Sequence, residues 1–203
     1  MARAVSPSEN TLSKGQAGKF ADLLVAALVK SGLPSAETQQ VLEHQGATLV
    51  AQFIVQVQAK VDQVSQIVRR TVAVDRSLSP QQAIVATGRR QFVTDDVLAA
   101  MPQGHGDTVT LEFVRLTKWM NDEVVEALLA EHGLVAADAF AVAAHNTADQ
   151  DFALKHPCFT HWQDTNGKWC LAAFSGWGGG RYVYVHRDDD GWHDGWWVAG
   201  VRK

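Results

Sequence analysis

Several features that define other protein classes are scarce in this chain of 203 residues. It has two cysteines, Cys158 and Cys170, which are too few for a disulfide framework. No stretch approaches the roughly 20 consecutive apolar residues that a membrane span requires. The formal net charge is −4 with 20% charged residues, so the charge balance gives no sign of a nucleic-acid or anionic-membrane partner. A binding function must therefore be argued from local features.

A secretory signal is also missing from the sequence. Residues 1–15 are polar and lack the apolar core of a signal peptide, and the first apolar run, 20–29, is short and contains Asp22. We therefore expect a soluble protein without a signal peptide, synthesised in the cytoplasm. Exposure outside the cell would need another route, such as a phage particle.

Four common residue types, Lys, Glu, Gln and Met, are absent from residues 171–202. Two sets of residues are interleaved in this region. The first set, called here the fixed frame, has large apolar residues and arginines at the alternate or turn-bounded positions that a packed β-structure needs: Trp177, Arg181, Val183, Val185, Arg187, Trp192, Trp196 and Trp197. The second set, called the variable set, fills the gaps: Ser175, Gly176, Gly178, Gly179, Gly180, Tyr182, Tyr184, His186, Asp188, Asp190, Gly191, His193 and Gly195.

The thirteen variable residues share no size, polarity or charge, but they share a coding property. Each can be reached from an asparagine codon, AAC or AAT, by changing only its adenines. Lys, Glu, Gln, Met and Trp cannot be reached in this way, and Trp occurs here only in the fixed frame. An alternative interpretation is a Trp- and Gly-rich β-meander with ordinary turns at 178–180 and 188–191. That alternative gives no reason for four residue types to be missing.

The segment from Phe174 to Lys203 has the pattern F-x-x-W-x-x-x-R-x-V-x-V-x-R-x-D-x-x-W-x-D-x-W-W-x-A-G-V-R-K. It resembles the variable proteins of diversity-generating retroelements, in which error-prone reverse transcription at template adenines rewrites the C-terminal repeat of a target gene. The ending 199–202 is similar to the Gly-Phe-Arg ending of the C-type-lectin-like fold, which these proteins share with formylglycine-generating enzymes; Val201 replaces the usual aromatic residue. The resemblance covers about 30 residues closely and about 30 more loosely, and it does not extend to residues 1–72.

The resemblance implies an α+β, C-type-lectin-like domain that binds a protein or glycan receptor through the variable set, with adhesion or phage tropism as its role. Tyr182 and Tyr184 would be the main contacts, because tyrosine supplies a large rigid surface with a polar tip. His186, His193 and the aspartates would add hydrogen bonds and charge. Two alternatives remain open, a formylglycine-generating-type enzyme with Cys170 as its reactive group and a plain oligomeric structural protein.

We find no catalytic or metal-binding constellation, and we expect no enzyme activity, metal or cofactor. The strand-like surroundings of Cys170 favour a small buried side chain. The calcium-loop pattern D-x-D-x-D-G with a later glutamate is not met by the acidic residues and histidines of 186–194. The cysteines and histidines of 156–170 lack the C-x-x-C or H-x-x-x-H spacing of zinc sites.

Residues 16–70 are expected to be helical after a loose N-terminus, 1–15. Apolar residues at helical spacing predict a helix capped by Thr11 or Ser13 and ended by Ser31–Pro34, and Ser35 is a candidate cap for a longer second helix. The second helix carries a seam with spacings of 4, 3, 4, 3 and 4: Val50, Ile54, Val57, Val61, Val64 and Val68. β-Branched residues at both seam positions favour three or more strands, so we expect a homo-oligomer, with a trimer as the first expectation. The alternative is a helical hairpin within one chain.

The C-type-lectin-like domain is expected over 71–203, with its variable region at 174–203. Strands are predicted at 71–74, 108–116, 168–174 and 182–187, and helices at 81–87, at 95–100 and from Asn121 to Gly133. Thr165-Asn166-Gly167 predicts a hairpin turn. In 182–187 the two-residue period places Tyr182, Tyr184 and His186 on one face and Val183, Val185 and Arg187 on the other.

Overall fold

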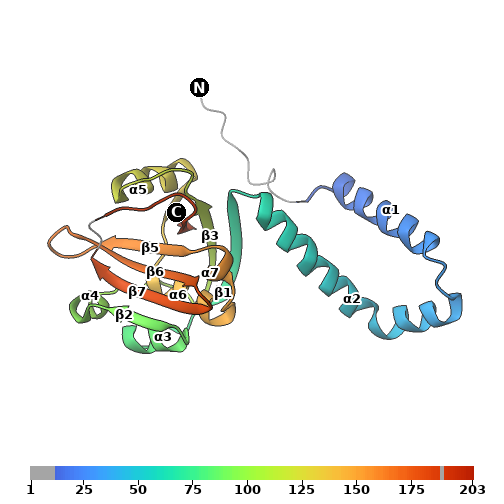
Figure 1. Ribbon diagram of the computed structural model, residues 1–203, viewed down its shortest axis with the longest axis horizontal. Helices are drawn as coiled ribbons and strands as arrows, with labels where there is room; N and C mark the ends of the chain where they lie inside the picture. The colour runs from blue at the N-terminus through green and yellow to red at the C-terminus, as the bar shows by residue number, and fades with distance from the viewer. Residues whose placement is uncertain (1–11, 188–189) are drawn as a thin grey trace, which may run out of the picture. The chain divides into compact units, whose positions relative to one another are not determined.

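The computed structural model describes residues 12–187 and 190–203. The chain divides into two compact units, Met1–Lys60 and Val61–Lys203. Figure 1 shows a helical segment followed by a mixed sheet with further helices. The expected combination of an N-terminal helical segment and a C-terminal region of mixed helix and sheet is therefore present.

The helical segment consists of α1 (Lys14–Lys30) and α2 (Ser35–Val64). The hydroxyl of Ser13 accepts a hydrogen bond from the backbone N–H of Gln16, and the Gln16 side chain bonds back, which completes a capping box. The two helices lie side by side (Figure 1). The ring centroids of Phe20 and Phe53 are 6.2 Å apart. None of the residues of α1 is buried. The hairpin is therefore formed within the chain, but its apolar side chains stay accessible.

The second helix is shorter than the sequence pattern predicted. It ends at Val64, and β1 (Ile67–Ala73) begins before residue 71, where we expected the sheet domain to start. The last seam residue, Val68, was assigned wrongly, because it lies in β1 and is only 1% exposed. A spacing of four residues fits a strand as well as a helix, since every second residue of a strand faces the same side. Val68 and Val72 both use that period to face the core.

In the described part of the second unit, a mixed sheet of eight strands organises the fold. The strand order is β1-β3-β8-β5-β6-β7-β2, and β4 pairs with β8. The bounds are Thr108–Arg115 for β3, Trp197–Arg202 for β8, Cys158–Gln163 for β5, Trp169–Trp177 for β6, Gly180–Arg187 for β7, Arg90–Val93 for β2 and Leu134–Ala136 for β4. The β2–β7 and β5–β8 pairs are parallel, and the other pairs are antiparallel.

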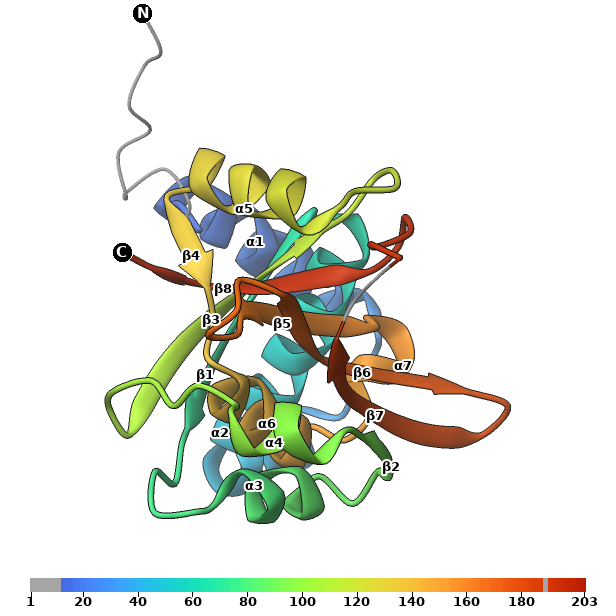
Figure 2. The same cartoon turned by 90° about the vertical axis from the view of Figure 1, so that its left-hand side faces the viewer.

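Helices cover the two faces of the sheet unequally (Figure 2). The first face packs against α3 (Pro80–Ala86), α4 (Asp95–Ala99), α6 (Ala139–Ala148) and α7 (Phe152–Lys155), and its core includes Phe113 and Phe174. The second face packs against α5 (Asp122–Glu131), whose Val125 and Leu129 belong to the same buried cluster as Phe159. Toward β7 and β2 this second face carries exposed aromatic side chains.

Most local signals of the sequence are confirmed. Ser79 and Asn121 cap α3 and α5 through their side chains, the hairpin turn joins β5 to β6, and the strands predicted from 108, 168 and 182 are present with small shifts of their ends. The described elements β2, β4, β8, α6 and α7 had not been predicted, and β5 was implied only by the hairpin turn that follows it. Among the described residues, no helix combines the length and the apolar character needed to cross a bilayer.

His145 is a buried titratable group in the core of the first face. It is 3% exposed, its ring centroid lies 5.1 Å from that of Phe113 and 4.5 Å from that of Phe152, and its Nε2 makes no hydrogen bond to a described residue. Burial lowers the pKa of His145 from 6.5 to about 4, because the charged imidazolium would lose its hydration. The neutral ring is therefore the form that the fold accommodates.

This environment predicts a loss of stability in mild acid. Because the folded pKa lies below the unfolded value, the contribution of His145 is complete above about pH 6.5 and declines as the pH falls toward 4, by about 3 kcal/mol in total. His145→Phe should remove that component of the decline. Urea unfolding of both proteins at about pH 7 and about pH 4.5 measures it. An equally steep decline in the variant would contradict the assignment.

Candidate functional site

Four residues of the fixed frame are buried in the core. Val183 and Val185 are 0% exposed, as the alternation predicted, and Trp192 and Trp197 are each 5% exposed. Trp177 contradicts the expectation of a packed scaffold position, because it is 67% exposed. It lies at the end of β6, opposite Gly180 and next to the turn into β7.

The arginines of the frame are held by hydrogen-bonded carboxylates and amides. Arg181 donates to the side chains of Gln150 (2.8 Å) and Asp151 (2.6 Å). Arg187 forms ion pairs with Asp96 (2.9 Å) and Asp164 (3.2 Å). These bonds tie β7 to α4, to the start of α7 and to the β5–β6 turn. A guanidinium group that bonds to two partners is held in one orientation, so Arg181 and Arg187 fix the two ends of β7 relative to these neighbours.

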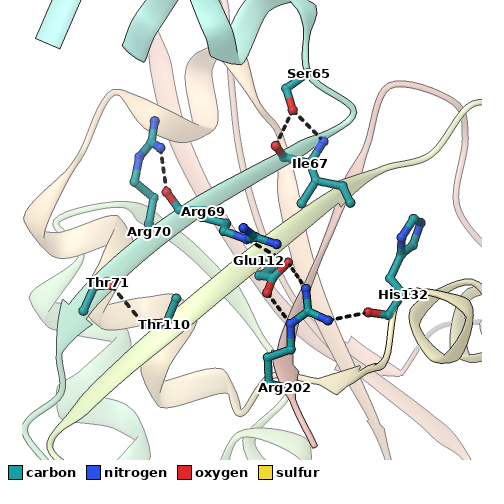
Figure 3. A network of polar contacts seen from close by, with 9 residues as sticks. All are labelled: Ser65, Ile67, Arg69, Arg70, Thr71, Thr110, Glu112, His132 and Arg202. Atoms are coloured by element: carbon teal, nitrogen blue, oxygen red, sulfur yellow. Dashed lines mark hydrogen bonds and ion pairs between the residues drawn. The ribbon is translucent and has the colours of Figure 1, made fainter. Parts of the chain in front are cut away.

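Arg202 ties β8 to the neighbouring strand β3 through a similar network of hydrogen bonds (Figure 3). Glu112 of β3 is 3% exposed and receives two guanidinium groups. Arg202 donates to it at 2.7 and 3.1 Å, Arg69 of β1 approaches within 3.1 Å, and Arg202 also donates to the carbonyl of His132. A buried carboxylate requires such partners, so this network anchors β8 next to β3.

None of the variable residues that the structure describes is buried. Asp188 lies outside the described residues, as does its neighbour Asp189. The others divide into exposed residues, namely Gly178, Gly179, Asp190 and His193, and half-buried residues, namely Ser175, Gly176, Gly180, Tyr182, Tyr184, His186, Gly191 and Gly195. They fall into two groups, one on β6 and β7 and one on the loop 190–195. The chain connects the groups after His186.

The first group forms part of a row of aromatic rings on the second face, called here the aromatic stripe: Trp177, Tyr182, Phe92, Tyr184 and His186. Trp177 stacks on Tyr182 with centroids 5.3 Å apart, and Phe92 stacks on Tyr184 at 5.2 Å. Phe92 also contacts Tyr182 at 6.2 Å, and Tyr184 meets His186 edge-on at 6.3 Å. The parallel pairing of β2 with β7 brings Phe92 directly beside Tyr184.

The second group is held by a separate set of contacts. Trp192 and Met120 exchange two backbone hydrogen bonds of 2.8 and 2.9 Å, and the indole of Trp119 donates to the carbonyl of Asp190 at 3.1 Å. The Trp192 ring stacks on Phe159 with centroids 3.4 Å apart. The loop is therefore fixed at its base, while His193 and Asp194 are exposed at its surface.

A buried ionic cluster supports this base from below. The side chain of His161 is 0% exposed, and its two ring nitrogens bond to Asp122 (2.5 Å) and Glu126 (3.0 Å). Burial alone would lower the pKa of His161, but the hydrogen bonds with the two carboxylates outweigh it and raise that pKa above its usual value. Asp122 also accepts a hydrogen bond from the indole of Trp192. The cluster therefore holds α5, β5 and the loop together through hydrogen bonds to the buried imidazole and to Asp122.

The glycines of the variable set differ in the room that they leave for a side chain. Gly178, Gly179, Gly191 and Gly195 have φ of +55, +80, +71 and +84°. A Cβ added at 178, 179 or 195 would have no heavy atom within 4 Å. At Gly191 it would lie 2.8 Å from the carbonyl oxygen of Met120 and 3.0 Å from the Trp119 ring. Among these four, only Gly191 is therefore blocked, and the obstacle includes main chain. A Cβ at Gly176 would instead collide with the Leu154 side chain, and one at Gly180 with the Tyr182 side chain.

The cysteines are placed unfavourably for nucleophilic chemistry. Cys158 and Cys170 are both free and 0% exposed. Burial raises the pKa of both thiols, that of Cys158 to about 12. The thiolate is the reactive form, so neither environment favours it. Within residues 12–187 and 190–203, no group of three or more His, Cys, Asp or Glu side chains is arranged to hold a metal ion.

Two aromatic residues of this surface were missed in the sequence. Phe92 is 43% exposed on β2, and Trp119 is 55% exposed beside the loop. Phe92 stands in the run Arg-Gln-Phe-Val-Thr, whose alternation was too short to predict a strand. Its pairing with β7, about 90 positions away, has no local signal at all.

Comparison of the chain with protein-family models, with curated proteins and with solved structures finds no match. The functional argument therefore depends on the residues and geometry described above.

The blocked environment of Gly191 gives a direct test with matched controls. Gly178→Asn and Gly179→Asn should change the free energy of unfolding by no more than about 0.5 kcal/mol, because asparagine tolerates positive φ and both sites are open. Gly191→Asn has the same backbone requirement but must displace the carbonyl of Met120, and should cost about 2 kcal/mol or more. Thermal or urea melts of the three variants compare them. Equal costs would show that the loop yields without strain.

Proposed function

We propose that this chain is a receptor-recognition protein whose C-terminal binding surface is diversified by a retroelement. The observation that carries the proposal is the agreement between coding class and accessibility. Every described residue of the variable set is exposed or half-buried, whereas four of the eight frame residues, Val183, Val185, Trp192 and Trp197, are buried; of the other four, Trp177 is exposed and Arg181, Arg187 and Trp196 are half-buried. Diversification of an accessible surface on an unchanged core would produce this distribution, because surface substitutions away from packing contacts cost little stability.

We further propose a C-type-lectin-like fold for the second unit. The support is local: the Ala-Gly-Val-Arg ending lies in β8. A Cβ at Gly200 would come within 2.9 Å of the Leu129 side chain and 3.0 Å of Leu134, so glycine leaves the space that α5 and β4 use to pack closely on β8. Arg202 anchors the same strand through Glu112. These contacts explain why this ending carries a glycine and an arginine.

The partner in this proposal is a protein or glycan receptor, and the role is adhesion or phage tropism. Tyr182 and Tyr184 are half-buried in the aromatic stripe, where a partner can cover their remaining surface. Buried tyrosine and tryptophan contribute much of the binding energy in protein interfaces. The open glycines at 178 and 179 leave room for a partner to approach the backbone.

The enzyme alternative has weaker support. A formylglycine-generating-type activity would use Cys170, yet this side chain lies within β6 among core residues of the first face, and burial raises the pKa of its thiol. Rapid labelling of Cys170 by a thiol reagent in the folded protein would favour the enzyme. A plain structural protein remains the third possibility, and the experiment below separates it from the proposal.

The decisive experiment is to sequence the gene and its genomic neighbourhood. The gene should lie near a reverse-transcriptase gene and a template copy of its last 90 or so bases. Deep sequencing of the gene in a growing population should find substitutions confined to codons of the variable set and to template adenines. The codons of Val183, Val185 and Trp197 serve as internal controls and should stay constant. Substitutions spread evenly over residues 171–203, or none above the error rate, would reject diversification.

The helical segment supports a second part of the proposal, a homo-oligomer with a trimer as the first expectation. Val50, Ile54 and Val61 of the seam are 60, 56 and 49% exposed, and Val57 is half-buried. Leu23 and Val29 of α1 are 68 and 80% exposed. Burying such side chains between copies would contribute about 25 cal/mol per Å². Several linked sites would also raise the avidity of a weak single site.

The oligomer is tested by placing charges on the apolar seam of α2, with the same charges placed elsewhere on the helix as the control. Ile54→Asp with Val61→Asp should convert the assembly to a species of 22.1 kDa, because charges on the seam cannot be buried. Gln52→Asp with Gln56→Asp, two exposed positions off the seam, is the control and should leave the mass unchanged. Light scattering at micromolar concentration measures both. A monomeric parent protein would reject the interface and leave the intrachain hairpin as the explanation.

A further inference from the structure

The aromatic stripe contains two members that do not belong to the variable set. Phe92 comes from β2, far from the C-terminal region, and Trp177 belongs to the fixed frame. They are 43 and 67% exposed, and each stacks on a tyrosine of the variable set. Large aromatic rings are seldom left so accessible without a partner to cover them. The two rings therefore need a functional explanation of their own.

The strand that carries Phe92 is rigidly held. Just before it, the guanidinium of Arg89 is buried and donates to Asn146 (2.9 Å) and to the carbonyls of Ser175 and Gln150 (3.0 Å each). Just after it, the N–H of Thr94 donates to the carbonyl of Val185 at 2.8 Å. Both ends of β2 are thus bonded to the elements that carry the variable set. Little entropy is lost when a partner docks on a ring fixed in this way.

The orientation of the rings limits the chemistry of the partner. Phe92 and Tyr184 are nearly parallel, at 12°, and Trp177 and Tyr182 are at 21°, so one face of each ring is covered by its neighbour. Ring edges carry partial positive charge. The Arg90 guanidinium lies 5.5 Å from the Phe92 centroid and adds a full positive charge. At its β2 end the stripe therefore presents apolar surface beside the positive charge of Arg90, which complements apolar side chains next to a carboxylate.

We propose that Phe92 and Trp177 are constant contacts of the ligand surface, and that the stripe takes a polypeptide segment with apolar side chains beside an acidic residue. This inference rests on the proposed function, because it assigns constant partners to the diversified residues. The constant rings supply affinity in every variant, while Tyr182, Tyr184 and the loop residues alter which segment is bound. A surface composed only of diversified residues would lose all its large side chains whenever they changed to glycine or serine.

The probe for the test is a set of short peptides selected from a displayed random library against the full chain. Peptides are retained when Tyr184→Asn weakens their binding, which places them on the stripe. Phe92→Ser and Trp177→Ser should each weaken the retained peptides about tenfold or more, as expected for buried aromatic contacts. Arg90→Gln should weaken peptides that carry Asp or Glu more than those that do not.

Val135→Ser is the matched control, because Val135 is 37% exposed on β4 at a distant part of the sheet. It should change the dissociation constants by less than about twofold. Thermal melts should show all variants folded, since none of the substituted side chains is buried. If Tyr184→Asn weakens binding but Phe92→Ser and Trp177→Ser do not, the constant contacts are rejected while the proposed function stands.

The partner class is tested in parallel on a glycan array. Glycans whose binding falls with Tyr184→Asn, without any peptide behaving in this way, would overturn the polypeptide assignment. If no peptide and no glycan responds to changes of Tyr182, Tyr184 or His186, the proposed function fails together with the inference. Peptides that respond to Tyr184, Phe92 and Trp177 alike support both.

Discussion

The two-residue period of β7 is the constraint on which the rest of this surface depends. Val183 and Val185 are fully buried, so Tyr182, Tyr184 and His186 must point to the opposite side. A shift of the pairing by one residue would exchange the two sets and expose the valines, which makes any other register costly. β7 pairs with β6 on one side and β2 on the other, so its register also decides which rings of those strands become neighbours. The aromatic stripe follows from that pairing.

The surface is supported by polar clusters that leave its outer side chains unconstrained. His161 holds α5 to β5 through Asp122 and Glu126, and Asp122 also fixes Trp192 at the base of the loop. Glu112 holds Arg202 and β8 in the same way. Removing one partner of such a buried pair costs more than an exposed pair contributes, because a charge would be left unpaired. This difference explains how one segment can combine positions that tolerate change with positions that do not.

Local chemistry made much of this architecture predictable, and long-range pairing made the rest unpredictable. Ser13, Ser79 and Asn121 act as helix caps because their side chains reach nearby N–H groups, which is a property of a few consecutive residues. The faces of β7 follow from alternation within eight residues. The stripe was only half predictable, since Phe92 reaches it through a parallel strand about 90 positions away. Val68 was misassigned because four-residue spacing serves helix and strand alike.

Backbone conformation adds a further reason why asparagine codons suit this surface under the proposed function. Gly178, Gly179 and Gly195 adopt positive φ, where glycine is unstrained and asparagine is among the best-tolerated other residues, and a Cβ at each of them would meet open space. A template that encodes asparagine and yields glycine by adenine changes therefore offers, at these turns, the two residue types that the backbone accepts most readily. At Tyr182 and Tyr184, in an extended strand, the backbone imposes no such limit, so the larger products of the same codon fit there. Under the proposal, the same asparagine codon would diversify the turns and the strand. The backbone angles would favour glycine and asparagine at the turns and allow larger residues in the strand.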